Sequence, residues 1–217
     1  MRELTRKNGH ASLQRMLRGY WSELVEAGSA FDVNALEEAA RLLLACQARG
    51  GTVFTAGNGG SASTASHMAC DLLKGTRAGG PPTFRAMALT DNMALMTAWA
   101  NDDAFDRVFA EQFISLARPG DLLVAISASG NSPNVLALVD AAHQADVVTI
   151  GVTGRDGGRL AGMVDLAVKS PADRIEVVED LHLIVAHSLC VTVRERLRVG
   201  DAVVSVSSVV PAATSAA

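Results

Sequence analysis

Two histidines and several acids stand at helical spacing in this sequence. His67 and Asp71 are four residues apart in a segment with a helical pattern, so their side chains share one face. Glu179 and His187 are eight apart on a second predicted helix, which separates them by about 80° around its axis. Asp180, seven from His187, aligns better. Two imidazoles and two carboxylates suit a divalent metal such as zinc, or proton transfer, and the spacing leaves Glu179 and Asp180 as alternatives.

Two glycine- and serine-rich segments each follow an apolar run and precede a helical pattern. They are Thr55–Ser63 (TAGNGGSAS) and Ile126–Asn134 (ISASGNSPN), in which Pro133 suits a first helical turn. At such turns backbone N–H groups and the helix dipole attract an anion, and serine hydroxyls add donors for a phosphate monoester. Because loops on neighbouring parallel strands meet at the carboxyl edge of the sheet, both segments predict one phosphate site.

The first segment also satisfies a dinucleotide-binding pattern, G-x-G-x-x-A, through Gly57, Gly59 and Ala62. That fingerprint needs an acidic residue about 20 positions further on, at the end of the next strand. The first acid at such a place is Asp91, some thirty residues on. We therefore expect no nucleotide cofactor, and a nucleotide-binding oxidoreductase is the weakest alternative function.

The elements that must position these residues alternate between strands and helices. Helical patterns cover 13–25 and 34–49 before the first strand. Five apolar runs predict strands at Thr52–Ala56, Phe84–Leu89, Leu122–Ser127, Val147–Thr153 and Leu166–Lys169. Helices are predicted at Ser61–Lys74, Pro133–Ala145, Gly158–Met163 and Arg174–Leu197, and several helical stretches are predicted between Asp91 and Ala117, one of them ending at Asn101–Asp103. The alternation indicates an α/β fold in which helices cover both faces of a parallel sheet.

Length and composition set the outer limits. The 217 residues are 49% hydrophobic and carry a net charge of −4, which argues against partners held by bulk electrostatics, namely nucleic acid or an anionic membrane. Cys46, Cys70 and Cys190 have no CxxC spacing, so we expect buried, reduced thiols. With no signal-like apolar run near the N-terminus, these features predict a cytoplasmic protein.

The motifs resemble the sugar isomerase (SIS) domain family, and within it the phosphoheptose isomerases, which interconvert sedoheptulose 7-phosphate and an aldoheptose 7-phosphate. The resemblance rests on GNGGSASTASHMACDL (57–72), ALTDNMALMTAWANDDAFDRVF (88–109), ISASGNSPNV (126–135), VTGRDGGRL (152–160) and RIEVVEDLHLIVAHSLC (174–190). It implies a five-stranded α/β/α sandwich and a homotetramer with active sites between subunits. Accordingly, we expect N-terminal helices for packing or assembly at 1–50, the SIS domain at 51–198 and a flexible tail at 199–217.

The resemblance also implies roles for single residues. Substrate contacts would come from both loops and a helix end: Asn58, Gly59, Gly60, Ser61, Asn101, Asp102, Ser127, Ala128, Ser129 and Ser132. Metal binding or catalysis would fall to His67, Asp71, Glu179 and His187, with zinc as the metal. The sequence has Asp71 where the family usually has Glu, Glu179 where it has Gln, and Ala128 where Thr is common.

Two functions of different class follow. The first is an enzyme that isomerises a sugar phosphate through an enediol, with Glu179 or Asp71 abstracting the proton, His187 as acid–base group and His67 as ligand or orienter. The second is a phosphosugar-binding or scaffold protein without catalysis. His67 and His187 separate the two, because a scaffold has no chemical need for them.

Overall fold

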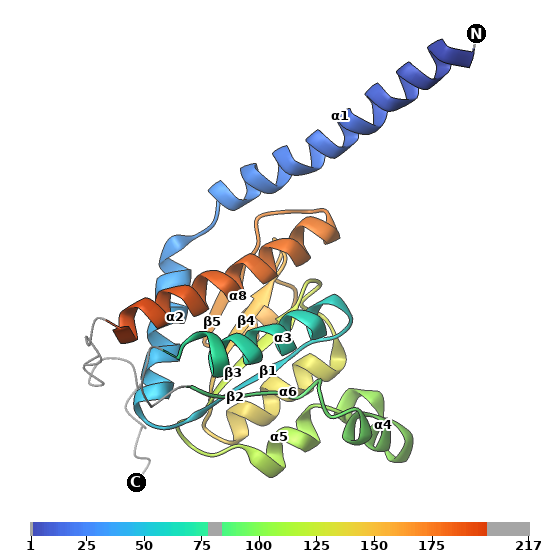
Figure 1. Cartoon of the computed structure of the whole chain (residues 1–217). Helices are drawn as coiled ribbons and strands as arrows, with labels where there is room; N and C mark the ends of the chain where they lie inside the picture. The colour runs from blue at the N-terminus through green and yellow to red at the C-terminus, as the bar shows by residue number, and fades with distance from the viewer. Residues whose placement is uncertain (1, 78–83, 199–217) are drawn as a thin grey trace.

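The sheet is the centre of the molecule (Figure 1). The computed structural model describes residues 2–77 and 84–198, with side chains from residue 12 onward. Five strands are parallel in the order β2-β1-β3-β4-β5: β1 (Thr52–Ala56), β2 (Arg85–Ala88), β3 (Leu122–Ser127), β4 (Val148–Thr153) and β5 (Leu166–Lys169). The predicted parallel α/β fold is confirmed. The predicted tail, 199–217, lies outside the described residues.

Helices connect the strands and extend the N-terminus. They are α1 (Arg2–Ser29), α2 (Val33–Ala48), α3 (Gly60–Cys70), α4 (Met93–Asp102), α5 (Ala110–Leu116), α6 (Pro133–Gln144), α7 (Leu160–Met163) and α8 (Ile175–Arg198). Two short segments join them, a π-helical turn η1 (Asp71–Gly75) and a 3₁₀ turn η2 (Phe105–Arg107). The helical stretches predicted between 91 and 117 are α4, η2 and α5, and α4 ends at Asp102, within the predicted helix end. α1 is longer than its apolar pattern predicted.

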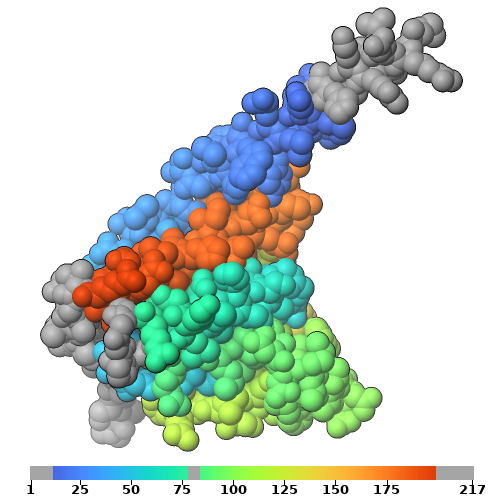
Figure 2. Space-filling model, viewed as in Figure 1, coloured from blue at the N-terminus to red at the C-terminus, as the bar shows by residue number. Residues whose placement is uncertain are grey.

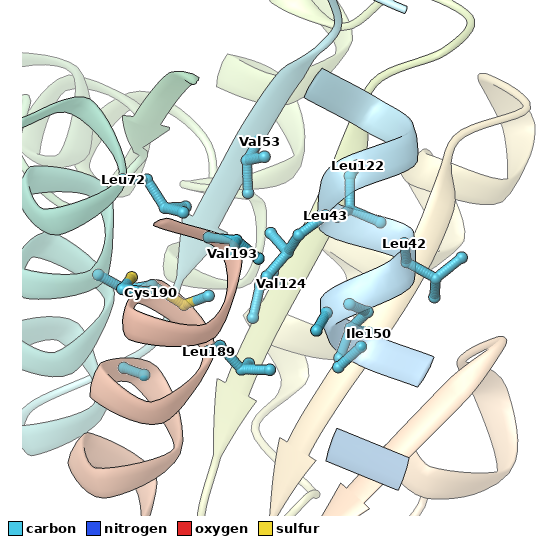
Figure 3. Packing of buried hydrophobic residues seen from close by; sticks show 14 of the residues in the cluster. Leu42, Leu43, Val53, Leu72, Leu122, Val124, Ile150, Leu189, Cys190 and Val193 are labelled. Atoms are coloured by element: carbon cyan, nitrogen blue, oxygen red, sulfur yellow. The ribbon is translucent and has the colours of Figure 1, made fainter. Parts of the chain in front are cut away.

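Alternating side chains of β1 and β3 enter two separate cores. In β3, Leu122, Val124 and Ile126 pack on one side, while Leu123 and Ala125 pack on the other. The first core lies under α2, α3 and α8, and Figure 3 shows residues of these helices meeting the strands. The second lies under α5 and α6. Both faces of the sheet are covered, as the continuous apolar strands predicted.

The strand order places the two candidate loops side by side. Strand order reverses between β1 and β3, which are hydrogen-bonded neighbours. In open α/β sheets, ligands bind outside the carboxyl ends of the strands at such a reversal. The loop after β1 leads into α3 and the loop after β3 leads into α6, so both phosphate-binding candidates flank this point.

Two helices leave apolar side chains uncovered. α1 projects from the body as an arm (Figures 1 and 2), and its Leu17, Trp21 and Val25 are exposed. In α4 no residue is buried, although the sequence MALMTAWAND is largely apolar.

Among the described helices, none combines the length and the apolar character needed to cross a membrane. Cys70 is exposed, so the expectation that all three cysteines are buried was wrong for this one.

Candidate active site

The first loop joins β1 to α3 and leaves the beginning of that helix uncapped by any side chain. Gly59 occupies the N-cap with φ of 55°, a backbone conformation that glycine adopts without strain. Asn58 is half-buried, Gly60 is exposed and Ser61 is buried. The first turn of α3 contains no acidic residue. The amino end of α3 therefore keeps its positive potential toward an anion.

The second loop brings hydroxyl groups to the beginning of α6. Ser127 is buried, and its Oγ lies 3.2 Å from the Oγ of Ser132. Ser132 is the N-cap residue of α6, but its side chain makes no capping hydrogen bond. Ser129 is exposed and its Oγ accepts a 3.2 Å hydrogen bond from the Asn131 backbone. The serines face one another across the loop, while Pro133 begins the helix as expected.

The second loop is held in shape by the segment that follows β4. The Gly154 N–H donates to the Ala128 carbonyl at 3.0 Å, and the Leu160 N–H donates to the Gly130 carbonyl at 2.9 Å. A Cβ on Gly130 would lie 2.1 Å from the Gly157 carbonyl oxygen, and φ of 61° further favours glycine there. Close backbone packing thus fixes the course of the loop.

A reciprocal amide pair joins the two loops. The Asn58 side chain donates to Asn134 Oδ1 at 2.8 Å, and the Asn134 side chain donates to Asn58 Oδ1 at 2.9 Å. Asn134 lies in the first turn of α6 and is buried. The pair sets the spacing between the beginnings of α3 and α6, which is the space a phosphate group would enter. The role of Asn134 was not predicted from the sequence; its place directly after the SGNSP motif was the available signal.

α3 and α8 bring the two histidines together. The Nε2 atoms of His67 and His187 are 2.8 Å apart. Asp71 Oδ2 lies 3.4 Å from the first of these nitrogens and 3.8 Å from the second. Asp71 begins the π-helical turn, a feature that recurs at functional sites. The predicted convergence of His67, Asp71 and His187 is thus present in the structure.

Glu179 lies elsewhere on the same helix pair, against the first loop. A Cβ on Gly60 would stand 2.5 Å from Glu179 Oε1 and 2.7 Å from Oε2, so any larger residue at this position would displace the carboxylate. His67 is seven residues beyond Gly60, about 10 Å along a helix. The structure therefore does not bring Glu179 into the group formed by the two histidines and Asp71.

Asp180, the alternative to Glu179, faces α1. Its Oδ2 accepts a 2.5 Å hydrogen bond from the Tyr20 hydroxyl, and this bond, with some burial, raises the pKa of Tyr20 to about 12. Arg174, directly before α8, forms a second polar link to α1 through an ion pair with Glu23 at 3.0 Å. Asp180 thus anchors α1 on α8, while Glu179 is the acid beside the loops.

Asn101 and Asp102 end α4, and both are exposed. The Asn101 side chain donates to Asp102 Oδ1 at 2.7 Å. No hydrogen bond among the described residues ties either side chain to the two loops. Their predicted substrate contacts stay predictions.

The histidine–aspartate group is open to solvent. The side chains of His67 and His187 are 47% and 48% exposed, and that of Asp71 is 32% exposed. A groove of about 810 Å³ lies elsewhere, beside α3 and β2, and is lined by Cys70, Leu73 and Met93 among others. A single chain therefore provides reactive groups on a surface without enclosing them.

The donor set of this group suits a transition metal. His67, Asp71 and His187 each offer one ligand atom, and all three atoms lie within 4.8 Å of one another. Two imidazole nitrogens and one carboxylate oxygen resemble the three-ligand sets of catalytic zinc sites, which keep a position open for water or substrate. The residues present fit such an ion.

The chain is similar to known proteins in both sequence and structure. The family model described as "SIS domain" matches residues 19–154. The chain is 43% identical to the phosphoheptose isomerase of Thiobacillus denitrificans, over 71% of this chain and 80% of that protein. It is 40% identical to that of Solidesulfovibrio magneticus, over 81% and 87%. The solved phosphoheptose isomerase GmhA of Neisseria gonorrhoeae is similar with a TM-score of 0.78 and 35% identity, covering 84% of this chain and 99% of that one.

Proposed function

This chain belongs to the SIS domain family, and we propose on that premise that it is a phosphoheptose isomerase, converting sedoheptulose 7-phosphate to D-glycero-D-manno-heptose 7-phosphate or a related long-chain sugar phosphate. The observation that carries this proposal is the joint arrangement of two phosphate-type loops at the sheet reversal and a His67–His187 pair on α3 and α8. Solved phosphoheptose isomerases at 35% and 32% identity share the fold with TM-scores of 0.78.

The terminal phosphate binds between the beginnings of α3 and α6. Backbone N–H groups of Gly59 and Gly60 and the hydroxyls of Ser127 and Ser132 surround that space, and two helix ends supply the positive potential. Asn58, Ser61, Ala128 and Ser129 complete the loops. Asn101 and Asp102, at the exposed end of α4, bind sugar hydroxyls. Anchoring the anion fixes where the carbonyl end of the sugar lies, which is the positional part of catalysis.

Aldose–ketose isomerisation moves a proton from one carbon to its neighbour through an enediol, so it needs a base and an acid. We assign proton abstraction to Glu179, because Asp71 is engaged with both histidines while the Glu179 carboxylate stands beside the first loop. His187 acts as the acid–base partner at the oxygens of the enediol. Without a metal, His67 orients His187, to which its Nε2 is hydrogen-bonded; with a metal bound, the two imidazoles would share the ion in place of that hydrogen bond.

His67, Asp71 and His187 would hold a divalent metal, which we propose is zinc. When bound, such an ion supplies a Lewis acid that polarises a carbonyl and stabilises negative charge on oxygen. A four-ligand site that also includes Glu179 would require the Glu179 side chain to move away from Gly60. We therefore assign three ligands to the metal and reserve Glu179 for the proton.

The enzyme acts as a homotetramer in the cytoplasm. Exposed apolar side chains on α1 (Leu17, Trp21, Val25) and the uncovered α4 indicate surfaces for other copies of the chain. A neighbouring subunit would also enclose the open histidine–aspartate group. Helices 1–50 serve this assembly and 51–198 form the catalytic SIS domain, and free thiols are compatible with the reducing cytoplasm.

A substrate assay tests the proposal. The purified protein with added zinc should convert sedoheptulose 7-phosphate to the aldose, observed by NMR. His187→Ala should abolish conversion, while His143→Ala, a change in an exposed histidine of α6, should leave it intact. Binding of the sugar phosphate without turnover by the wild type would replace the isomerase by a phosphosugar-binding protein.

A further inference from the structure

Tyr20 of α1 has no place in the chemistry above, yet its hydroxyl is bonded beside the proposed base. It donates to Asp180 Oδ2 at 2.5 Å, and Asp180 directly follows Glu179 in α8. Because this hydrogen bond raises the pKa of Tyr20 to about 12, the hydroxyl keeps its proton at neutral pH and remains a donor. The two partners are 160 residues apart in the chain, so the bond ties the N-terminal helix to the turn of α8 that carries Glu179.

The other polar link between α1 and α8 is weaker. It is the ion pair of Arg174 with Glu23, whose side chains are 55% and 37% exposed. An ion pair this open to solvent contributes little, because water screens the two charges. Tyr20 and Asp180 are both half-buried, and a hydrogen bond to a carboxylate is among the strong ones. The position of α8 against α1 therefore depends chiefly on this bond and on apolar packing.

The apolar packing around Tyr20 extends to the second phosphate loop. One hydrophobic cluster joins α1, the first two turns of α8 and the loop, and it includes Tyr20, Leu24, Val177, Val178, Leu181 and Ala128. On the loop side, the Glu179 carboxylate lies against Gly60, at the beginning of α3. Figure 2 shows α8 between α1 and α3 on the face in view. The first turns of α8 thus have α1 on one side and the phosphate loops on the other.

We infer that Tyr20 is a positioning residue for the isomerisation: its hydrogen bond to Asp180 holds the first turns of α8 so that the Glu179 carboxylate stays beside the first phosphate loop. This inference rests on the proposed function, which makes Glu179 the base. Glu179 and Asp180 are neighbours on one helix, so a rotation of α8 that follows loss of the Tyr20 bond moves both. A displacement of the base by about 1 Å is enough to slow proton abstraction strongly.

The main test is Tyr20→Phe, which keeps the ring in the cluster and removes the hydroxyl. We expect kcat for sedoheptulose 7-phosphate to fall about tenfold, the scale of one lost hydrogen bond. KM should change by less than about twofold, because the ring still packs in the cluster that reaches Ala128. Light scattering should give the wild-type mass, since the side chains proposed for assembly, such as Trp21, lie on the exposed face of α1.

Variants of Asp180 test the same bond from its other end. The amide oxygen of Asp180→Asn still accepts the Tyr20 hydrogen, so this variant should lose much less kcat than Asp180→Ala. The double variant Tyr20→Phe/Asp180→Ala should lose no more than Asp180→Ala alone, because the bond is already absent. Should Tyr20→Phe not fold, the two Asp180 variants decide, and equal losses of kcat in both would overturn the inference.

Ser29→Ala is the matched control, because it removes a hydroxyl that bonds within α1, to the Val25 carbonyl at 2.8 Å. This variant should keep the wild-type kcat and KM. A wild-type kcat in Tyr20→Phe means that the bond serves stability alone, and the inference is then wrong. It is also wrong if KM rises as much as kcat falls, which would indicate general loosening of the site, or if kcat falls only together with the mass of the assembly.

Failure of the inference and failure of the proposed function give different results. Wild-type turnover with an unchanged kcat in Tyr20→Phe removes the inference alone. Absence of wild-type turnover removes the isomerase, and the ¹³C NMR signal of the Glu179 carboxylate then decides whether Tyr20 positions this group. A shift of the signal in Tyr20→Phe, as in Gly60→Ala and unlike Ser29→Ala, supports the inference. A signal that stays at its wild-type position in Tyr20→Phe overturns it.

Discussion

The Nε2 atoms of His67 and His187 are 2.8 Å apart, although 120 residues separate them in the chain. In this hydrogen bond one imidazole nitrogen donates its N–H and the other accepts. α3 and α8 run alongside each other with Gly60 opposite Glu179 and His67 opposite His187 (Figures 1 and 2). The helix pair therefore presents a carboxylate near the anion site and two imidazoles further along.

Metal binding should depend on the histidine pair. We expect about one zinc ion per wild-type chain by elemental analysis, and its loss in His67→Ala and in His187→Ala because each removes a ligand atom. Zinc at 100 times its Kd should stabilise the wild type by about 2.7 kcal/mol, and this gain should vanish in both variants. His143→Ala, which removes an imidazole outside the group, should bind zinc normally. If the double variant His67→Ala/His187→Ala still binds one zinc ion, these two histidines are not the metal ligands.

Gly60→Ala should reduce kcat about 100-fold with the fold intact. Its Cβ would stand 2.5 Å from Glu179 Oε1, so the carboxylate must move by about 1 Å, and displacements of that size cost about two orders of magnitude in rate. Steady-state kinetics with circular dichroism measure both effects. Gly162→Ala is the matched control, because a Cβ there meets no atom within 4 Å. Unchanged kcat in Gly60→Ala would mean that Glu179 does not act from its present position.

The Asn58–Asn134 pair should behave as a unit. Asn134→Ala leaves the Asn58 amide unpaired, at a cost of about 1–3 kcal/mol in the free energy of unfolding, and should raise KM because the loops lose their fixed spacing. Denaturant unfolding of both single variants and the double variant gives the coupling energy. We expect about 1 kcal/mol or more. Strictly additive effects would contradict a mutual hydrogen bond.

Assembly should require the apolar face of α1. Trp21 is 65% exposed, and a charge placed there should oppose packing against another copy. Light scattering should find a tetramer for the wild type and smaller species for Trp21→Glu. Ser22→Glu, a polar position beside it on the same helix, serves as the control for added charge. A monomeric wild type would remove the assembly proposal.

Much of the fold followed from local pattern. Three strands, Thr52–Ala56, Leu122–Ser127 and Leu166–Lys169, were predicted with the bounds that the structure has, because short apolar runs limited by Gly or Asp leave little choice. Several helical stretches were predicted within 91–117, with a helix end at Asn101–Asp103, but the short 3₁₀ turn between α4 and α5 was not, since apolar residues occur throughout this segment. The π-helical turn at Asp71 was also not predicted, because no residue type in the sequence marks a turn that contains one residue more than an α-helical turn.

The sequence predicted most residues of the candidate site, but it did not predict which of them contact one another. Helical spacing brought His67 near Asp71, yet it did not separate Glu179 from Asp180, whose directions around α8 differ by only about 100°. The contact of Asp180 with Tyr20 depends on how α1 packs, which periodicity does not specify. The same holds for Asn134, which gains its role from Asn58, 76 residues away in the chain.

Proton transfer in heavy water tests the central claim most directly. Sedoheptulose 7-phosphate is incubated with the zinc-loaded wild type in D₂O and followed by ¹H NMR. We predict that the aldose forms with deuterium at C2, as an enediol protonated from solvent-exchanging groups requires, and that Glu179→Gln forms neither product nor label. Binding of the sugar phosphate with no aldose and no deuterium, over hours and with metal present, would contradict the assignment of this chain as an isomerase.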